Sequence, residues 1–193
     1  MRQWWFSAPS IRLNRLSTNT FLGLFMDLYI IRHGIAVERG DPAYPWDDDR
    51  PLTPEGIHKF RLAARGLDRL DIRPERILSS PLIRAHQTAE ILRDAVSPDL
   101  DIEMTQALRP GTDFSETLGA VVTTGARSVA VVGHEPHLSG FTSFLLSGPK
   151  GGASVLLKKG AVACVSFTVE PAPGLGSLQW LVQPGVLRRL AEV

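Results

Sequence analysis

From Asp27 onward, short apolar runs alternate with longer stretches whose apolar residues recur at helical spacing. Leu28–Ile31 is a purely apolar run that ends at the polar pair Arg32-His33, and such a run is typical of a buried strand. Helical spacing begins after Thr53, where a capping side chain precedes a proline at the first helical position. The pattern predicts a helix to about Leu70, with four residues on its inner face: Ile57, Phe60, Ala64 and Leu67.

The same layout then repeats along the chain. We expect further strands at three places, namely 76–78, near Ile102, and 128–132. A helical pattern follows each of them, at 82–92, after Thr112-Asp113, and from about 136 to Leu146. Beyond the glycine-rich segment, strand patterns occupy 153–157, 161–168 and 178–182. Strands that alternate with helices predict an α/β fold, a three-layer α/β/α sandwich with a largely parallel central sheet.

The first 25 residues differ in composition from the rest. They contain Arg2, Arg12 and Arg15 but no Asp or Glu. An acid-free segment rich in Arg and Ser is typical of an organelle transit peptide. The alternative is a translated upstream extension, with Met26 as the true start of the protein, and we favour this second interpretation. We therefore expect one domain over residues 26–193, preceded by a leader or mis-assigned start at 1–25 that is disordered.

Composition excludes several classes of protein. The chain has 193 residues, 44% hydrophobic and 21% charged, with a formal net charge of +1. These values are typical of a globular domain and argue against nucleic acid or a membrane surface as partner. The single cysteine, Cys164, cannot form an internal disulfide, and no apolar stretch approaches the roughly 20 residues that span a bilayer. We expect a soluble, cytoplasmic monomer.

Basic side chains follow three of the predicted strands. Arg32 and His33 follow the first strand, Arg84 lies one helical turn beyond the second, and His134 follows the strand at 128–132. In an open α/β sheet, ligands bind beyond the carboxyl ends of the strands. Two guanidinium groups and two imidazoles at this edge, beside helix N-termini, would suit a dianion such as a phosphoryl group.

These residues also carry a family resemblance. Ile31–Gly34, which reads Ile-Arg-His-Gly, resembles the first signature of the histidine phosphatase superfamily. Residues 80–89 are similar to its second motif and Val132-Gly133-His134 to its third, while Arg50–Gly56 resembles the small phosphohistidine phosphatase branch. The match runs in order from about residue 27 to 168. It implies a phosphoglycerate mutase-like fold.

The resemblance also implies a mechanism. His33 would be the nucleophile and would form a phosphohistidine intermediate that water hydrolyses. Arg32, Arg84 and His134 would stabilise charge on the transferred oxygens. We expect the carbonyl of Gly34 to hold the other ring nitrogen of His33, and three residues to contact the substrate: Gly34, Arg50 and Glu135. The mechanism requires neither a metal nor an organic cofactor.

The sequence offers no obvious general acid. Asp47, Asp48 and Asp49 are candidates, although a solvated loop explains an acidic run equally well. An imidazole leaving group needs less protonation than a sugar alkoxide. The expected substrate is therefore a phosphorylated protein carrying phosphohistidine, with a small phosphate ester as the alternative.

Three other functions remain open. The first is a phosphomonoesterase or mutase acting on a small sugar or cofactor phosphate. The second is a metal hydrolase that uses His33, His134 and His137 with an aspartate, although the paired arginines would repel a divalent ion. The third is a non-catalytic phosphate-binding module. Under the phosphatase hypothesis, His137 packs or faces solvent, and His58 and His86 are structural.

Overall fold

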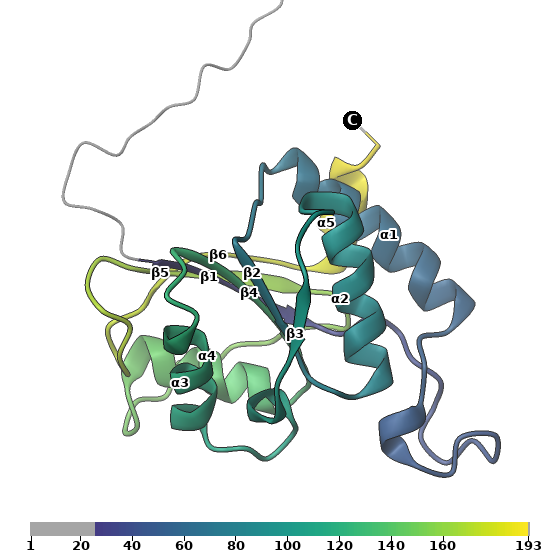
Figure 1. Ribbon diagram of the computed structural model, residues 1–193, viewed down its shortest axis with the longest axis horizontal. Coiled ribbons are helices and arrows are strands. Elements are labelled where there is room, and N and C mark those ends of the chain that lie inside the picture. Colours follow the sequence, from purple (N-terminus) through teal and green to yellow (C-terminus); the bar gives the residue numbers. More distant parts are fainter. Residues whose placement is uncertain (1–25, 193) are drawn as a thin grey trace, which may run out of the picture.

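Six strands form one sheet in the computed structural model, which describes residues 26–192 (Figure 1). Across the sheet the order is β3-β2-β4-β1-β5-β6. In chain order the strands are β1 (Met26–Arg32), β2 (Arg76–Ser79), β3 (Ile102–Met104), β4 (Ser128–Gly133), β5 (Val162–Phe167) and β6 (Ser177–Val182). The predicted leader, residues 1–25, lies outside the described residues, so its interpretation stays a prediction.

The sheet is mixed. β3, β2, β4 and β1 pair in parallel, whereas β5 is antiparallel to both β1 and β6. The predicted α/β sandwich is confirmed, and its parallel part comprises the four strands that alternate with helices.

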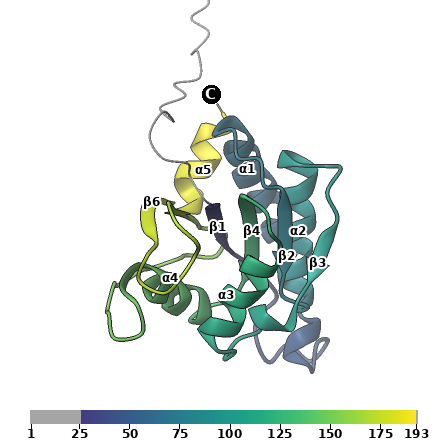
Figure 2. The same ribbon diagram turned by 60° about the vertical axis from the view of Figure 1, so that its left-hand side comes forward.

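Helices cover both faces of the sheet. α1 (Pro54–Arg69), α2 (Ile83–Val96) and α5 (Pro184–Leu190) pack together on one face. α3 (Phe114–Thr123) and α4 (His137–Ser147) cover the other face, as Figures 1 and 2 both show. Two short 3-10 turns, η1 (Asp47–Asp49) and η2 (Gln106–Leu108), lie in the connections.

Strand β1 lies between the two hydrophobic cores. Leu28 and Ile30 face the core formed with α3 and α4, while Tyr29 and Ile31 face the core formed with α1, α2 and α5. Because successive side chains of a strand point to opposite faces, a strand buried on both sides needs an uninterrupted apolar run. Each fully buried aliphatic side chain contributes about 1.5–3 kcal/mol. Burial on both faces therefore holds in place the strand that precedes His33.

The predicted start of α1 is confirmed in atomic detail. Thr53 caps the helix, since its Oγ1 accepts a hydrogen bond from the amide of Gly56 at 2.9 Å. A Cβ on Gly56 would lie 1.9 Å from the carbonyl oxygen of Ile35. Only glycine permits this close approach, which packs the helix N-terminus against the loop that follows His33.

One predicted strand is wrong. Residues 153–157 are irregular, because the carbonyls of Leu156 and Leu157 accept hydrogen bonds from the side chains of Gln183 and Arg32 and not from a strand partner. The side chain of Leu157 is nevertheless buried. None of the helices over residues 26–192 has the length and apolarity needed to cross a membrane.

Candidate active site

The carboxyl ends of β1 and β4 bring two histidine rings together. The two strands pair in parallel, with Arg32 opposite Gly133, and the amide of His33 donates to the carbonyl of Gly133 at 3.0 Å. The rings of His33 and His134 have centroids 5.1 Å apart. Both side chains are buried. The predicted convergence of the two imidazoles is present in the fold.

His33 is held with one ring nitrogen free of the protein backbone. Its Nδ1 lies 2.7 Å from the carbonyl oxygen of Gly34. Since a carbonyl can only accept, Nδ1 carries the proton and Nε2 keeps its lone pair in the neutral ring. Burial lowers the pKa of His33 to about 3, and the charges of Arg84, Arg32 and Lys159 add to this effect while the bond to Gly34 opposes it. The ring is therefore a neutral base and nucleophile at physiological pH.

A buried threonine joins the first two motifs. Thr88 Oγ1 accepts a hydrogen bond from the amide of Gly34 at 3.0 Å and donates to the carbonyl oxygen of Arg84 at 2.7 Å. Thr88 is fully buried. Thr88 therefore connects Gly34, whose carbonyl orients the His33 ring, to the turn of α2 that carries Arg84.

His134 contacts the second motif through its ring. Nε2 lies 2.8 Å from the hydroxyl oxygen of Ser80. Burial lowers the pKa of His134 to about 2, and the charges of Arg84 and of His33 in its protonated form contribute to the lowering. This imidazole is therefore also neutral at physiological pH.

The two arginines are each anchored by part of the guanidinium group. Arg32 donates from one terminal nitrogen to the carbonyl oxygen of Leu157 at 2.7 Å. Arg84 donates from both terminal nitrogens to Asp47, to its carbonyl oxygen at 2.6 Å and to Oδ2 at 2.9 Å. Burial lowers the pKa of both arginines, and the acidic groups Glu135 and Asp47, respectively, oppose that shift.

Three buried nitrogens of this cluster have no hydrogen-bond partner within residues 26–192: Nε of Arg32, Nε of Arg84 and Nδ1 of His134. Buried polar groups in folded proteins are nearly always paired, so these three unpaired nitrogens require an explanation. Guanidinium N–H groups can only donate. Unpaired cationic donors beside the free Nε2 of a neutral histidine form a centre suited to a phosphoryl group.

Arg50 and Glu135 differ in how they relate to this centre. The guanidinium of Arg50 contacts Asp47 Oδ1 from two nitrogens, at 3.0 and 2.8 Å, and also donates to the carbonyl of Val37. All three of its side-chain nitrogens therefore have a partner within the protein. Glu135 has a buried carboxylate oxygen without a partner in the described part of the chain, and its charge acts on Arg32.

The three consecutive aspartates have different surroundings. Burial opposes ionisation of Asp47, but hydrogen bonds from Arg39 and Arg50 and the charge of Arg84 outweigh it and hold its pKa well below the usual range. Asp48 pairs with Arg109, and Asp49 is exposed. Asp47 is therefore an anion at the site, and a carboxylate so strongly ionised is a poor proton donor.

His137 belongs to the core and not to the histidine pair. Its Nε2 lies 3.0 Å from the hydroxyl oxygen of Thr117, and its ring packs against Phe114. Of the two predicted alternatives for His137, packing or facing solvent, the structure shows packing. Over residues 26–192, no three His, Cys, Asp or Glu side chains are grouped so that they could hold a metal ion.

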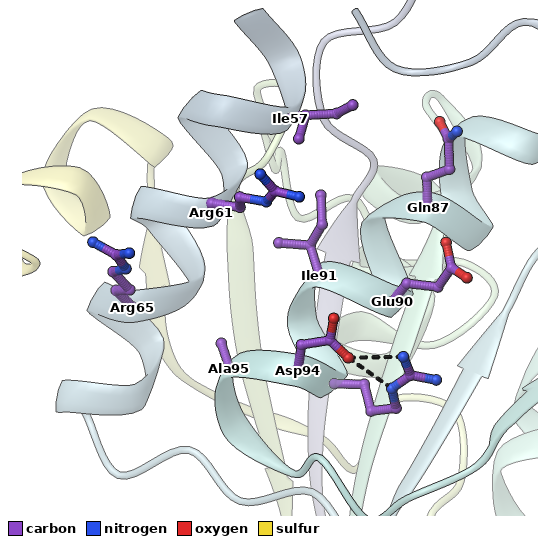
Figure 3. A pocket seen from close by; sticks show the side chains of 9 residues that line it. Ile57, Arg61, Arg65, Gln87, Glu90, Ile91, Asp94 and Ala95 are labelled. Carbon is purple, nitrogen blue, oxygen red and sulfur yellow. Dashed lines mark hydrogen bonds and ion pairs between the residues drawn. The ribbon is translucent and has the colours of Figure 1, made fainter. Parts of the chain in front are cut away.

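A separate groove of about 510 Å³ lies between α1 and α2 (Figure 3). Its aliphatic side chains include Ile57 and Ile91. Asp94 at its edge is paired with Arg93 at 2.7 Å. The groove is not lined by Arg32, His33, Arg84 or His134, which form the cationic centre. The groove is therefore distinct from that centre.

The fold and the cationic centre together define an α/β enzyme of phosphoryl transfer. The family model described as histidine phosphatase superfamily (branch 1) matches residues 28–110. Phosphohistidine phosphatase SixA of Escherichia coli is 32% identical over 162 residues, which cover 82% of this chain and 94% of that protein. The chain therefore belongs to the histidine phosphatase superfamily and is a phosphatase.

Three further proteins are similar to this chain. An uncharacterized protein of Picosynechococcus sp. is 38% identical over 141 residues, covering 71% of this chain and 83% of that protein. The solved structure of the protein histidine phosphatase SixA complexed with tungstate superposes with a TM-score of 0.72 at 31% identity, covering 84% of this chain and 99% of that one. A phosphoglycerate mutase from Bacillus anthracis shares the fold at a TM-score of 0.62 and 16% identity, over 87% of this chain and 97% of that one.

Proposed function

We propose that this phosphatase removes phosphoryl groups from phosphohistidine in proteins, with His33 as the nucleophile. The observation that carries the proposal is the set of unpaired buried donors, Nε of Arg32, Nε of Arg84 and Nδ1 of His134, around a neutral imidazole. The similarity to phosphohistidine phosphatase SixA supports the same substrate class.

The reaction proceeds in two displacements. The lone pair of His33 Nε2 attacks phosphorus in line, the bond from phosphorus to the substrate imidazole breaks, and that imidazole takes up a proton from solvent water. Water then attacks the phosphoryl group on His33, the new P–N bond breaks, and phosphate leaves. The carbonyl of Gly34 keeps the proton on Nδ1, so Nε2 can be the reacting atom in both steps.

The remaining groups stabilise the transferred oxygens. In this proposal the hydroxyl of Ser80 donates to Nε2 of His134, which places the proton of that neutral ring on Nδ1. Nδ1 of His134 and the Nε groups of Arg32 and Arg84 then donate to the non-bridging oxygens. Such fixed donors typically contribute a factor of about 10²–10³ each in kcat.

The experiment that tests the covalent step is trapping of the intermediate with a phosphohistidine peptide that carries a radioactive phosphoryl group. Wild-type enzyme should give an acid-labile, alkali-stable label, and His33→Ala should give none. His58→Ala is the matched control, because His58 is exposed on α1. An active enzyme that never becomes labelled would refute the covalent mechanism.

A second candidate function is hydrolysis of a small phosphate ester. Glu135 favours it, because its unpaired buried carboxylate oxygen could protonate an alkoxide leaving group. Turnover of a phosphohistidine peptide, a phosphoserine peptide and a sugar phosphate, each with and without EDTA, separates the two. If Glu135 is that acid, Glu135→Gln should slow ester hydrolysis far more than phosphohistidine hydrolysis. A wild-type rate highest on the sugar phosphate would overturn the phosphohistidine proposal.

A further inference from the structure

Asp47 forms the centre of a cluster of three guanidinium groups at the edge of the candidate site. Oδ2 accepts from Arg84, and Oδ1 accepts from Arg50 and from Arg39. The three partners differ in exposure: the side chain of Arg84 is 3% exposed and that of Arg50 12%, whereas that of Arg39 is 79% exposed. The two buried contacts join Arg50 to Arg84 through one carboxylate.

The contact between Asp47 and Arg84 fixes the orientation of a guanidinium plane. Two points on Asp47, the carbonyl oxygen and Oδ2, hold the two terminal nitrogens of Arg84. A guanidinium held by two parallel bonds cannot rotate about its Cζ–Nε axis without breaking one of them. The opposite edge of the group carries Nε, which is buried and unpaired within the described chain.

Asp47 is itself held in place by the loop that carries it. Arg50 donates to Oδ1 of Asp47 from two nitrogens, and its third nitrogen donates to the carbonyl of Val37. One residue along, Asp48 pairs with Arg109. In Figure 1, η1 lies beside the N-terminal end of α2. Arg84 is the second residue of that helix. These contacts therefore hold the Asp47 carboxylate in a fixed position.

We propose that Asp47 is a positioning residue, which orients Arg84 so that its Nε donates to the transferred phosphoryl group, and that Arg50 holds Asp47 in this role. The inference rests on the proposed role of Arg84 in the candidate site. It also gives Arg50 a function without contact to the substrate. As a permanent anion bonded to three arginines, Asp47 acts through Arg84 and does not donate a proton to the leaving group.

Leaving-group dependence distinguishes positioning from acid catalysis. Arg84 acts on the non-bridging oxygens, which p-nitrophenyl phosphate and phenyl phosphate share. Asp47→Asn should therefore lower kcat/KM on both by the same factor, roughly ten- to hundredfold, the size expected for loss of a charge-assisted hydrogen bond. Asp49→Asn is the matched control from the same turn, and should change kcat/KM less than about twofold. A loss confined to phenyl phosphate would make Asp47 a general acid and overturn the proposal.

A double-mutant cycle tests whether Asp47 acts through Arg84. In an Arg84→Lys background the two-point contact is already lost, so adding Asp47→Asn should cost less than about threefold. Arg50→Lys provides a second route if Asp47→Asn folds poorly. It should lower kcat/KM severalfold on both esters, and this loss should also vanish in the Arg84→Lys background. Additive losses in both cycles would refute the positioning role.

The outcome also separates this inference from the proposed function. If Arg84→Lys retains wild-type turnover, the candidate site itself is wrongly assigned. If Arg84→Lys is impaired while Asp47→Asn and Arg50→Lys keep wild-type kcat/KM, the positioning role is refuted and the proposed function stands.

Discussion

The hydroxyl of Thr88 should contribute more to the stability of this enzyme than a single buried hydrogen bond usually does. It accepts from the amide of Gly34 and donates to the carbonyl of Arg84, at 3.0 and 2.7 Å, in a fully buried position. Thr88→Val keeps the shape of the side chain but removes both contacts. The amide of Gly34 is then buried without an acceptor, which costs about 1–3 kcal/mol, and the lost bond to Arg84 costs about 0.5–1.5 kcal/mol. The free energy of unfolding should fall by roughly 2–4 kcal/mol.

Two control variants separate the hydroxyl from the methyl group. Thr88→Ser keeps the hydroxyl and loses only a methyl, at about 1 kcal/mol. Thr142→Val in α4 loses a buried hydroxyl that donates to Leu138 and receives no amide, and should cost no more than about 1.5 kcal/mol. The assay is urea unfolding with a common m-value. If Thr88→Val is less destabilising than Thr88→Ser, the bridging argument is wrong. Folded Thr88→Val should also show reduced kcat/KM, because Gly34 orients His33.

Three further results are expected. Gly56→Ala should destabilise the protein by about 1–3 kcal/mol or more in urea unfolding, since its Cβ would lie 1.9 Å from the oxygen of Ile35. Gly119→Ala is the control: no atom lies within 4 Å of its Cβ, so it should stabilise the protein by roughly 0.5–1 kcal/mol. The folded pKa values of His33 and His134, about 3 and about 2, lie below the ordinary 6.5, so the unfolded chain binds more protons between these values. Stability should be complete above about pH 6.5 and fall as the pH decreases towards 3, by about 2 kcal/mol for each histidine at pH 5, and an NMR titration that protonates the His33 ring above pH 5 would contradict this. Hydrolysis should persist in excess EDTA, and loss of activity that returns with a divalent metal would favour the metal-hydrolase alternative.

The strand ends of the site could be predicted because they follow from local sequence. One apolar run precedes Arg32-His33 and another precedes His134. Each run predicts a strand that stops near a polar residue. Parallel pairing then places both at one edge, where the structure shows the rings 5.1 Å apart. Local pattern and family resemblance agree at these positions, so the prediction needed no knowledge of long-range contacts.

Other features depend on pairings that sequence patterns do not contain. Residues 153–157 have the residue types of a strand, but the carbonyls of Leu156 and Leu157 accept hydrogen bonds from the side chains of Gln183 and Arg32 and not from a neighbouring strand. The antiparallel direction of β5 likewise depends on its neighbours.

The contacts of Asp47 and Thr88 with Arg84 could not be predicted from the sequence either. Arg84 lies 37 residues from Asp47 and one helical turn from Thr88. The acidic run at 47–49 was a visible signal, but it favoured a proton donor or a solvated loop over a contact with Arg84. For Thr88 the sequence gives no signal beyond its place within the second motif.

The main chain around His33 is tied to both neighbouring strands. The amide of His33 donates to the carbonyl of Gly133 at the end of β4, and the amide of Gly160, before β5, donates to the carbonyls of Arg32 and His33 at 3.1 and 3.0 Å. Opening these bonds means separating the middle of the sheet, so the His33 amide should exchange with deuterium only when the whole domain unfolds. Loss of catalysis on heating should then coincide with global denaturation, with no earlier stage in which the nucleophile alone comes loose.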